Sequence, residues 1–436
     1  MHYWLECMAC GALYPPDEIR YVCDRTVGEP PVLCGGLLDV RYDMDALRRK
    51  ISTALFESRA GAWIGADASG VWRYRELVLP VPAAAIVTRP EGNTPLYRSE
   101  RLQAWSRVAD LQIKHEGENP TGSFKDRGMT VGITQARQLG CRSVACASTG
   151  NTSASLAAYG ALAGMDVWVF VPEGKIALGK LAQAMAYGAR TLQIRGDFDA
   201  AMSLVREVCD RTGVYLLNSV NPFRVEGQKT IVFEMLQQRN WQPPDWIVLP
   251  AGNLGNTSAF GKALHEFFQL GLIARMPRLA CVQATGADPF FKSYLLDFAE
   301  RRTVVAHTIA TAIRIGNPVS HERAVRALRW TDGVVTEVSD QEIMEAKAEI
   351  DAAGIGCEPA SASSLAGLRK LVAAGVIGPD ESTVAVLTGH LLKDPEATIN
   401  YHLGTLDGIV SQHVAAPVVV DATFEAVSRI LEEKRR

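Results

Sequence analysis

A regular alternation of strand and helix patterns, beginning near residue 111, constrains the fold of this chain more than any other feature. Short apolar runs rich in β-branched residues alternate with longer Ala- and Leu-rich runs of helical period. Such alternation predicts an α/β protein with parallel sheets that helices cover on both faces. We expect strands at Leu111–Lys114, Ser143–Ala147, Asp166–Val171, Arg190–Ile194, Val214–Leu217, Trp246–Pro250, Arg278–Gln283 and Thr383–Leu387.

Helices are expected between these strands. One runs from Lys125 to Leu139, and the others span Thr152–Ala163, Leu178–Tyr187, Asp199–Arg211, Gln228–Gln238, Thr257–Gln269 and Asp340–Ala353. In this class of fold, ligands bind beyond the carboxyl ends of the strands. The turns that lead from a strand into a helix are therefore the places to search for a site.

Two of these turns are built from Gly, Asn, Ser and Thr. They are "ASTGNTSAS" at positions 147–155 and "PAGNLGNTSAF" at positions 250–260. Glycines let a backbone approach a ligand closely, and the free N–H groups at a helix start favour an anion. The second turn thus predicts a phosphate cradle. Either turn alone is also compatible with an ordinary capped helix start.

The stretch "NPTGSFKDRGM" at positions 119–129 places Lys125 in the first turn of a helix, where the macrodipole disfavours a cation. The helix start and the neighbouring Arg127 should both lower the pKa of Lys125 and leave more free amine at neutral pH. A free amine is what Schiff-base chemistry requires. Beside a phosphate cradle on an α/β sheet, it predicts a pyridoxal 5′-phosphate (PLP) site. The alternative is a solvated surface lysine paired with Asp126.

The first 45 residues form a separate module with four cysteines, at positions 7, 10, 23 and 34. Cys7-x-x-Cys10 is one half of a zinc ribbon, but such a ribbon needs a second close pair, and Pro31 occupies the position of the missing partner. Two interpretations stay open. Cys23 completes a zinc site if the loop folds back, or the module is a metal-free remnant. With only one close pair we expect weak binding and less than one zinc per chain after purification.

Composition narrows the class of protein. A chain of 436 residues is too long for one compact core, and 47% hydrophobic with 21% charged residues is typical of a globular protein. A net charge of −3 provides no overall electrostatic attraction for nucleic acid or an anionic membrane, so small molecules are the expected partners. The absence of a long apolar run or a signal-like start, together with scattered cysteines, predicts a cytoplasmic protein with no membrane contact.

Taken together, these motifs resemble the successive blocks of the bacterial threonine synthase family, PLP enzymes of the tryptophan-synthase-β fold type, also called fold type II. The matching blocks run in family order from about Glu91 to His402. They read "NPTGSFKDRGM", "ASTGNTSAS", "EGKIALGKLAQ", "NSVNPFRVEGQKT", "AGNLGN", "TAIRIGNP", "EPASASS" and "LTGHLLKD". The resemblance implies PLP as cofactor and conversion of O-phospho-L-homoserine and water to L-threonine and phosphate, by γ-elimination and β-addition of water.

The resemblance also implies a role for individual residues. Lys125 would hold the cofactor covalently, Asn151 would bond its phenolic oxygen, and Thr388 would face its pyridine nitrogen. The residues implied for the cofactor phosphate are Gly252, Asn253, Gly255 and Asn256. Those implied for the substrate carboxylate are Ser148, Thr149 and Thr152, and those for the substrate phosphate are Asn218, Ser219 and Arg224.

The resemblance divides the chain into a Cys-containing module and two sheet domains, the smaller of which closes over the larger. The expected bounds are 1–45 for the module, 46–93 for a connector, 94–131 with 226–411 for the large PLP-binding domain, 132–225 for the small domain and 412–436 for a C-terminal segment. A homodimer is implied as well. Two alternatives remain at this point: a related synthase that acts on phosphoserine or acetylserine, of the cysteate or cysteine synthase type, and a non-catalytic homologue.

Overall fold

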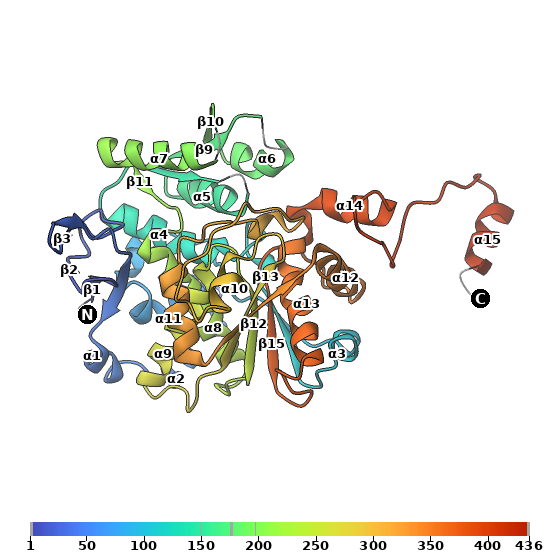
Figure 1. Cartoon of the computed structure of the whole chain (residues 1–436), viewed down its shortest axis with the longest axis horizontal. Coiled ribbons are helices and arrows are strands. Elements are labelled where there is room, and N and C mark those ends of the chain that lie inside the picture. Colours follow the sequence, from blue (N-terminus) through green and yellow to red (C-terminus); the bar gives the residue numbers. More distant parts are fainter. Residues whose placement is uncertain (1–2, 149, 175–177, 197, 434–436) are drawn as a thin grey trace.

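The chain folds around two parallel sheets, as the sequence predicts, and a computed structural model describes residues 3–148, 150–174, 178–196 and 198–433 (Figure 1). The larger sheet has the strand order β14-β13-β12-β15-β7-β6, and only β6 is antiparallel to its neighbour. Its strands are β6 (Leu96–Tyr97), β7 (Leu111–His115), β12 (Trp246–Pro250), β13 (Arg278–Ala284), β14 (Val334–Val338) and β15 (Thr383–Leu387). Every predicted strand of this sheet is confirmed. The edge strand β14 was missed because its polar Thr336 and Glu337 interrupt the apolar run.

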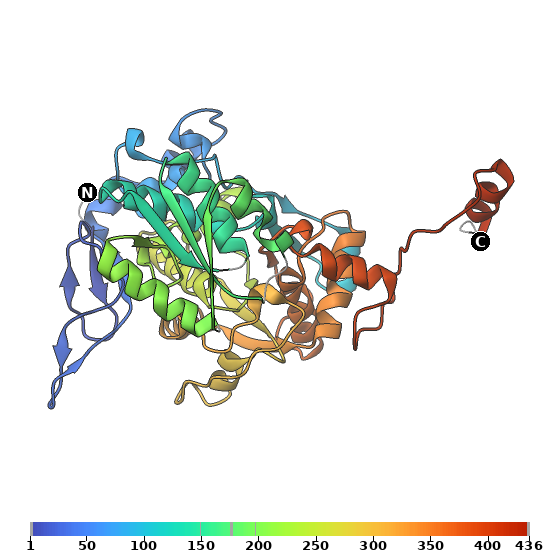
Figure 2. The same ribbon diagram turned by 90° about the horizontal axis from the view of Figure 1, so that it is seen from above.

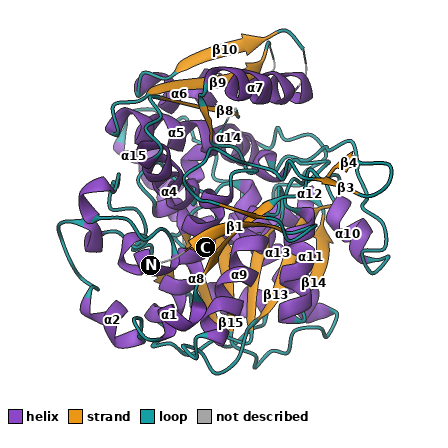
Figure 3. Cartoon of the chain, turned by 90° about the vertical axis from the view of Figure 1, so that its left-hand side faces the viewer, coloured by secondary structure: helices purple, strands orange, loops and turns teal. Residues whose placement is uncertain are grey.

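The smaller sheet has the order β10-β9-β8-β11, and all its pairings are parallel. Its strands are β8 (Ser143–Ala147), β9 (Asp166–Pro172), β10 (Arg190–Ile194) and β11 (Tyr215–Leu216). Successive residues of β8 point to opposite faces, so Val144 and Cys146 join one core while Ala145 and Ala147 join another. Helices therefore cover both faces, as Figure 3 shows for this upper part of the molecule.

Helices also cover both faces of the larger sheet, because β12 alternates in the same way. Ile247 and Leu249 pack into the core on the side of α8 and α9, while Trp246 and Val248 pack toward α12 and α13. The helices of the two sheet regions are α3 (Glu100–Ser106), α4 (Lys125–Gln138), α5 (Asn151–Leu162), α6 (Leu178–Ala186), α7 (Phe198–Thr212), α8 (Pro222–Gln238), α9 (Gly255–Gln269), α10 (Pro289–Tyr294), α11 (His321–Thr331), α12 (Asp340–Ala352) and α13 (Pro359–Ala373).

The remaining segments lie at the two ends of the chain. The N-terminal module has a three-stranded antiparallel sheet, β2-β1-β5, and a hairpin, β3-β4, which projects from the body (Figure 2). Its strands are β1 (Tyr3–Cys7), β2 (Leu13–Tyr14), β3 (Thr26–Val27), β4 (Val32–Leu33) and β5 (Leu38–Tyr42), and α1 (Met44–Arg48) and α2 (Thr53–Ser58) follow. After α14 (Pro395–Leu403) the chain leaves the body and ends in α15 (Phe424–Glu433) (Figure 1). None of the described helices is long and apolar enough to span a membrane.

Helices α4 and α8 cross at a point where only glycine fits. A Cβ atom on Gly227 would lie 1.9 Å from the carbonyl oxygen of Arg127, and one on Gly128 would lie 2.8 Å from the carbonyl oxygen of Arg224. Both distances are shorter than any real carbon–oxygen contact, so the two backbones touch directly. This crossing brings the first turns of the two helices, with Lys125 and Arg224, to one place.

Beneath the same crossing lies a fully buried cluster of four charged side chains. Arg127 grips Glu116 with two hydrogen bonds, Nε to Oε2 at 2.6 Å and Nη2 to Oε1 at 2.8 Å. Its Nη2 also donates to Glu234 Oε1 at 2.8 Å, and Lys114 Nζ donates to that same oxygen at 2.7 Å. All four side chains are at most 2% exposed. The cluster ties β7, α4 and α8 together.

This cluster predicts a large loss of stability in Arg127→Met. The substitution leaves two buried carboxylates with one cation, and removing one partner of a buried ion pair costs about 3–5 kcal/mol. Arg137→Met is the matched control, because Arg137 lies exposed on the same helix and should change stability by less than about 0.5 kcal/mol. Urea unfolding followed by circular dichroism measures both. Equal midpoints for the two variants would contradict the assignment of Arg127 to the framework.

Candidate active site

The chain places Lys125 at the carboxyl ends of two neighbouring strands, β7 and β15. The segment just before Lys125 pairs with the segment that follows β15, because Ser123 forms a β-bridge with Gly389 and the Phe124 N–H donates to the Thr388 carbonyl at 3.0 Å. The ammonium nitrogen of Lys125 lies 3.8 Å from the centroid of the Phe124 ring. Helix α4 therefore starts at a fixed position and presents its first side chain to the site.

Burial and the positive charge of Arg224 together lower the pKa of Lys125 to about 7, while the charge of Glu358 opposes the shift. The predicted direction is confirmed, but its predicted cause is wrong in one respect. Arg127 does not repel the amine, because its charge is neutralised by Glu116 and Glu234 below the helix. The cation that acts on Lys125 is Arg224, which lies in the first turn of α8.

Asp126 does not serve as a surface partner of Lys125. Its carboxylate is buried and accepts hydrogen bonds from the Thr121 N–H at 2.7 Å, the Thr121 hydroxyl at 2.6 Å and the Ser155 hydroxyl at 2.5 Å. Burial raises the pKa of Asp126 to about 6. Asp126 thus ties the turn before Lys125 to α5, and the alternative of a solvated Lys125–Asp126 pair is wrong.

Glu358 is a site residue that the sequence analysis missed. It is the N-cap of α13, and both its carboxylate oxygens accept from Asn151 Nδ2, at 3.2 and 3.1 Å. Burial raises its pKa, and its charge acts on Lys125. The available signal was a glutamate directly before a proline at the start of a helix, within the "EPASASS" block. Glu358 connects Lys125 with Asn151.

The predicted phosphate cradle lies at the start of α9. The first N–H groups of a helix lack partners within it, and a Cβ atom on Gly252 would lie 2.9 Å from Ile313 Cα, so the loop backbone is held close to its neighbours. Gly255 opens the helix, and among the described residues the buried Oδ1 of Asn256 has no hydrogen-bond partner. The side chain of Asn253 is differently engaged: it accepts from the Val319 N–H at 2.7 Å and donates to Ser219 Oγ at 3.1 Å.

Arg224 carries a buried charge that no carboxylate among the described residues neutralises by an ion pair. It is 2% exposed and donates from Nη1 to the Leu217 carbonyl at 3.0 Å, and its Nε has no hydrogen-bond partner within the described ranges. Burial lowers its pKa to about 10. Of its two predicted companions, Ser219 contacts Asn253, whereas the Asn218 amide donates to the Ala147 carbonyl at 3.0 Å and accepts from the Ala147 N–H at 2.9 Å.

The residues implied for the substrate carboxylate lie where β8 passes into α5. The Ser148 N–H donates to the Phe170 carbonyl at 3.2 Å, and Thr152 stands in the first turn of α5. Thr149 lies outside the described residues. Thr388 follows β15, and its hydroxyl lies 3.0 Å from that of Ser361. The predicted residues that the structure describes thus come from the carboxyl ends of strands in both sheets.

Comparison with known proteins identifies the enzyme family of this chain. The chain belongs to the pyridoxal-phosphate dependent enzyme family, whose model matches residues 87–389. Within that family it stands among the threonine synthases: it is 46% identical to threonine synthase of Methanosarcina acetivorans over 100% of both chains. It is 43% identical to chloroplastic threonine synthase 2 of Arabidopsis thaliana, with 96% of this chain and 82% of that protein covered.

The solved structures agree on the fold. Threonine synthase from Escherichia coli superposes with a TM-score of 0.63 at 19% identity, covering 99% of this chain and 100% of that one. A threonine deaminase from Solanum lycopersicum superposes with a TM-score of 0.62 at 21% identity over 73% of this chain and 84% of that one. The chain therefore has the fold type II architecture that the sequence implied.

The residues present fit the PLP cofactor of this family. A lysine with a pKa of about 7 offers the free amine that the aldehyde needs, and the helix start at Gly255 offers N–H groups to its phosphate. The buried Oδ1 of Asn256, beside that helix start, has no partner in the part of the chain that the structure describes. The hydroxyls of Thr388 and Ser361 provide neutral partners for a ring nitrogen.

The low pKa of Lys125 can be measured on the cofactor-free protein. Acylation of the Lys125 peptide, quantified by mass spectrometry against exposed lysines in the same digest, should reach half its maximal rate near pH 7, because the amine reacts only when deprotonated. Arg224→Met should raise this midpoint, since the Arg224 charge lowers the pKa, and Glu358→Gln should lower it. Shifts in the opposite directions would refute the electrostatic account.

Proposed function

We propose that this chain converts O-phospho-L-homoserine and water to L-threonine and phosphate. The observation that carries the substrate assignment is the buried charge of Arg224, which acts on Lys125 and has no ion-pair partner among the described residues. A buried unpaired cation is costly, and a planar guanidinium matches a phosphate with two hydrogen bonds. A phosphorylated substrate would supply the missing anion.

The cofactor would be held by residues from four strand ends. Lys125 would bind it covalently, Asn151 would donate to its phenolic oxygen, and the Thr388 hydroxyl would face its ring nitrogen. The cofactor phosphate would take the N–H groups of the loop formed by Gly252, Asn253, Gly255 and Asn256. When bound, PLP supplies an electron sink that stabilises negative charge on the substrate carbons.

Lys125 would move the protons of the reaction. An amine with a pKa near 7 can both accept and return a proton at neutral pH, which suits transfers at Cα, Cβ and Cγ of the substrate. Ser148, Thr149 and Thr152 would hold the substrate carboxylate. Arg224 and Ser219, with Asn218 shaping the loop, would bind the phosphate as its bond to Cγ breaks. Water would then add at Cβ and become the hydroxyl of threonine.

The site would need to exclude water until that last step, and we propose that closure of the small domain does so. The small domain would span 132–225, and the large domain 94–131 with 226–411. One side chain joins the two domains. Lys393, from the large domain, donates to the side chain of Gln183 on α6 and, within the large domain, to the Thr121 carbonyl at 3.1 Å. These contacts lie beside the start of α4.

We further propose that the enzyme works in the cytoplasm as a homodimer. The exposed apolar side chains of α15 support an association, because Phe424 is 81% exposed on a helix that leaves the body.

A synthase acting on acetylserine is the second candidate. It would keep Lys125 and Asn151 but would not require the buried charge of Arg224, since acetate carries less charge than phosphate.

Lys125→Ala should lose both cofactor binding and turnover, because the same amine holds the cofactor and moves the protons. Borohydride should fix the cofactor on the Lys125 peptide of the parent and leave none in the variant. Lys292→Ala is the control, because Lys292 is a half-exposed lysine that pairs with Asp288. Normal production of threonine by Lys125→Ala would exclude the proposed role.

Arg224→Ala should lower kcat/KM for O-phospho-L-homoserine by roughly a hundred- to several-thousandfold. Charge-assisted hydrogen bonds contribute roughly 1.5–3 kcal/mol each, so losing a two-pronged contact removes about 3–5 kcal/mol of transition-state binding. Arg224→Lys should stay well below the parent, since it keeps the charge but loses the planar fork. Steady-state release of phosphate and formation of threonine measure the effect.

Two controls make this experiment decisive. Arg211→Ala removes an exposed arginine of α7 and should leave kcat/KM within about twofold of the parent, as surface substitutions usually do. Visible absorbance of the lysine-bound cofactor shows whether Arg224→Ala still assembles its site. Near-parental kcat/KM with full cofactor absorbance would remove Arg224 from substrate binding, and acetylserine turnover by the parent would favour the second candidate.

A further inference from the structure

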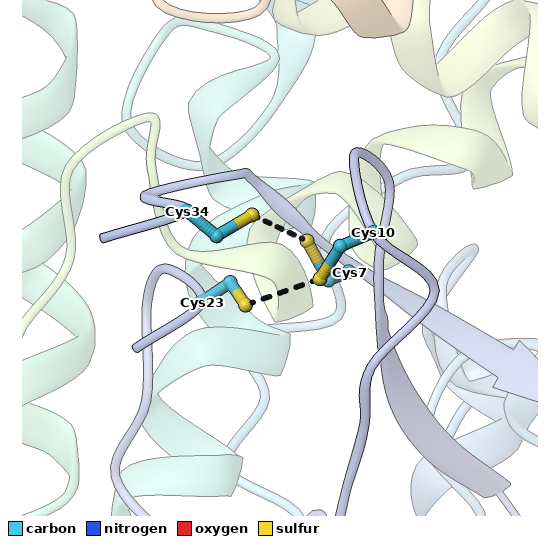
Figure 4. Close-up of side chains that lie close together, drawn as sticks. All are labelled: Cys7, Cys10, Cys23 and Cys34. Atoms are coloured by element: carbon cyan, nitrogen blue, oxygen red, sulfur yellow. Dashed lines mark hydrogen bonds between the residues drawn. The ribbon is translucent and has the colours of Figure 1, made fainter. Parts of the chain in front are cut away.

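The four cysteines of the N-terminal module, from three separate positions along its chain, converge on one point (Figure 4). All four sulfur atoms lie within 4.8 Å of one another. Cys7 Sγ lies 3.7 Å from Cys34 Sγ, and Cys10 Sγ lies 3.6 Å from Cys23 Sγ. None of the four forms a disulfide. The cluster stands outside the site that binds the cofactor and serves no step of the proposed reaction.

A hairpin supplies the second pair of cysteines that the sequence spacing lacks. The strands β3 and β4 pair between Cys23 and Cys34, so both cysteines lie at the base of the hairpin. The Cys34 N–H donates to the Arg25 carbonyl at 2.8 Å, and the Gly35 N–H donates to the Cys23 carbonyl at 3.0 Å. Pro31 belongs to the loop of this hairpin, so it does not interrupt the cluster. The expectation of weak binding rested on a missing pair, which the fold provides.

The sulfur spacing matches a tetrahedral zinc site. With zinc–sulfur bonds of about 2.3 Å, the edge of a regular tetrahedron of sulfurs is about 3.8 Å. The Cys7–Cys34 and Cys10–Cys23 distances, 3.7 and 3.6 Å, agree with that edge. A disulfide would need about 2.05 Å. The sulfurs are thus too far apart for a covalent bond and close enough to share one ion.

Backbone amides around the cluster are arranged to stabilise thiolates. The N–H groups of Ala9 and Cys10 point at the Cys7 sulfur. The N–H of Arg25 points at Cys23, and that of Gly36 points at Cys34, so in three of the four cases the donor is the second residue after the cysteine. Hydrogen bonds of this kind orient the ligands of a metal and offset their charge.

Gly36 shows how closely the cluster is packed. A Cβ atom at this position would lie 2.7 Å from Cys7 Sγ and 2.9 Å from the Ala9 Cβ, so no larger residue fits. The backbone N–H groups around the cysteines and the close packing at Gly36 together fix the directions of the four sulfur atoms. Four thiolates in tetrahedral array are the ligand set of structural zinc sites.

We propose that Cys7, Cys10, Cys23 and Cys34 bind one zinc ion as four thiolates. Each thiol releases its proton to solvent as the ion binds, and no oxidation or reduction is involved. Four protein ligands leave no open position for water or substrate, so the ion holds structure rather than performing catalysis.

The position of the module shows what the ion would hold. Between Cys10 and Cys23, the Tyr21 hydroxyl accepts from the Leu216 N–H of β11 at 2.7 Å. After Cys34, Asp39 of β5 accepts from Arg326 of α11 at 2.8 Å. One segment therefore contacts the smaller sheet and the other packs against the helices of the larger one. By joining the two segments, the zinc ion would hold the contact with the smaller sheet and the contact with α11 in a fixed relative position.

Metal analysis of the full-length protein, purified without chelator, tests the proposal. We expect one zinc per chain in the parent, and almost none in the double variant Cys7→Ser/Cys34→Ser. Cys141→Ser is the control, because Cys141 lies outside the cluster and should retain the full zinc content. Thermal unfolding should occur at a lower temperature in the double variant and in chelator-treated parent.

A second measurement is independent of how the variants fold. Parent protein stripped of metal and supplied with Co²⁺ should develop the intense visible bands of cobalt in a tetrahedral thiolate site, and zinc should displace them. Iron in place of zinc, two disulfides in the purified parent, or an unchanged zinc content in the double variant would each overturn the proposal.

Discussion

The buried ion cluster around Arg127 is the interaction on which the site depends. A buried salt bridge adds little net stability over a well-packed apolar core, but it tolerates only one arrangement of its members, since each charge left unpaired is costly. Here the members come from β7, α4 and α8. Arg127 lies two residues after Lys125, so the cluster that fixes Arg127 below the helix also fixes where Lys125 emerges above it. The glycine contact between Gly128 and Gly227 then sets how closely α8 approaches.

The result is a site that holds more positive charge than it neutralises. Lys125 and Arg224 stand within electrostatic reach of each other, and Glu358 is the carboxylate that acts on Lys125. Burial lowers the pKa of both cations. Such an arrangement is unfavourable in the empty protein, and functional sites commonly keep strain of this kind. It becomes favourable when an anion enters, as the proposed phosphorylated substrate would.

Local patterns in the sequence were sufficient to predict the sheets, and contacts distant in the sequence explain what was missed. Eight strands were placed correctly, most of them because a buried parallel strand is a short apolar run, although β10 (RTLQI) is partly polar and exposed. Helix α8 begins at Pro222 rather than near Gln228, because Asn221 accepts the Phe223 N–H and starts the helix earlier. Glu358 and the pairing of Cys23 with Cys34 depend on how α13 and the β3-β4 hairpin fold back, and no local pattern encodes that.

The N-terminal module also bears on the order in which the chain folds during synthesis. The four cysteines lie within the first 34 residues, so their cluster can assemble as soon as that segment leaves the ribosome. The partner that β5 needs arrives much later, because Arg326 lies 287 residues after Asp39. At roughly 5–20 residues per second, that interval lasts on the order of 15–60 seconds. During this time β5 of the module would be exposed to solvent, because α11 has not yet been synthesised. Early assembly of the cysteine cluster would hold β5 in its native register until α11 packs against it.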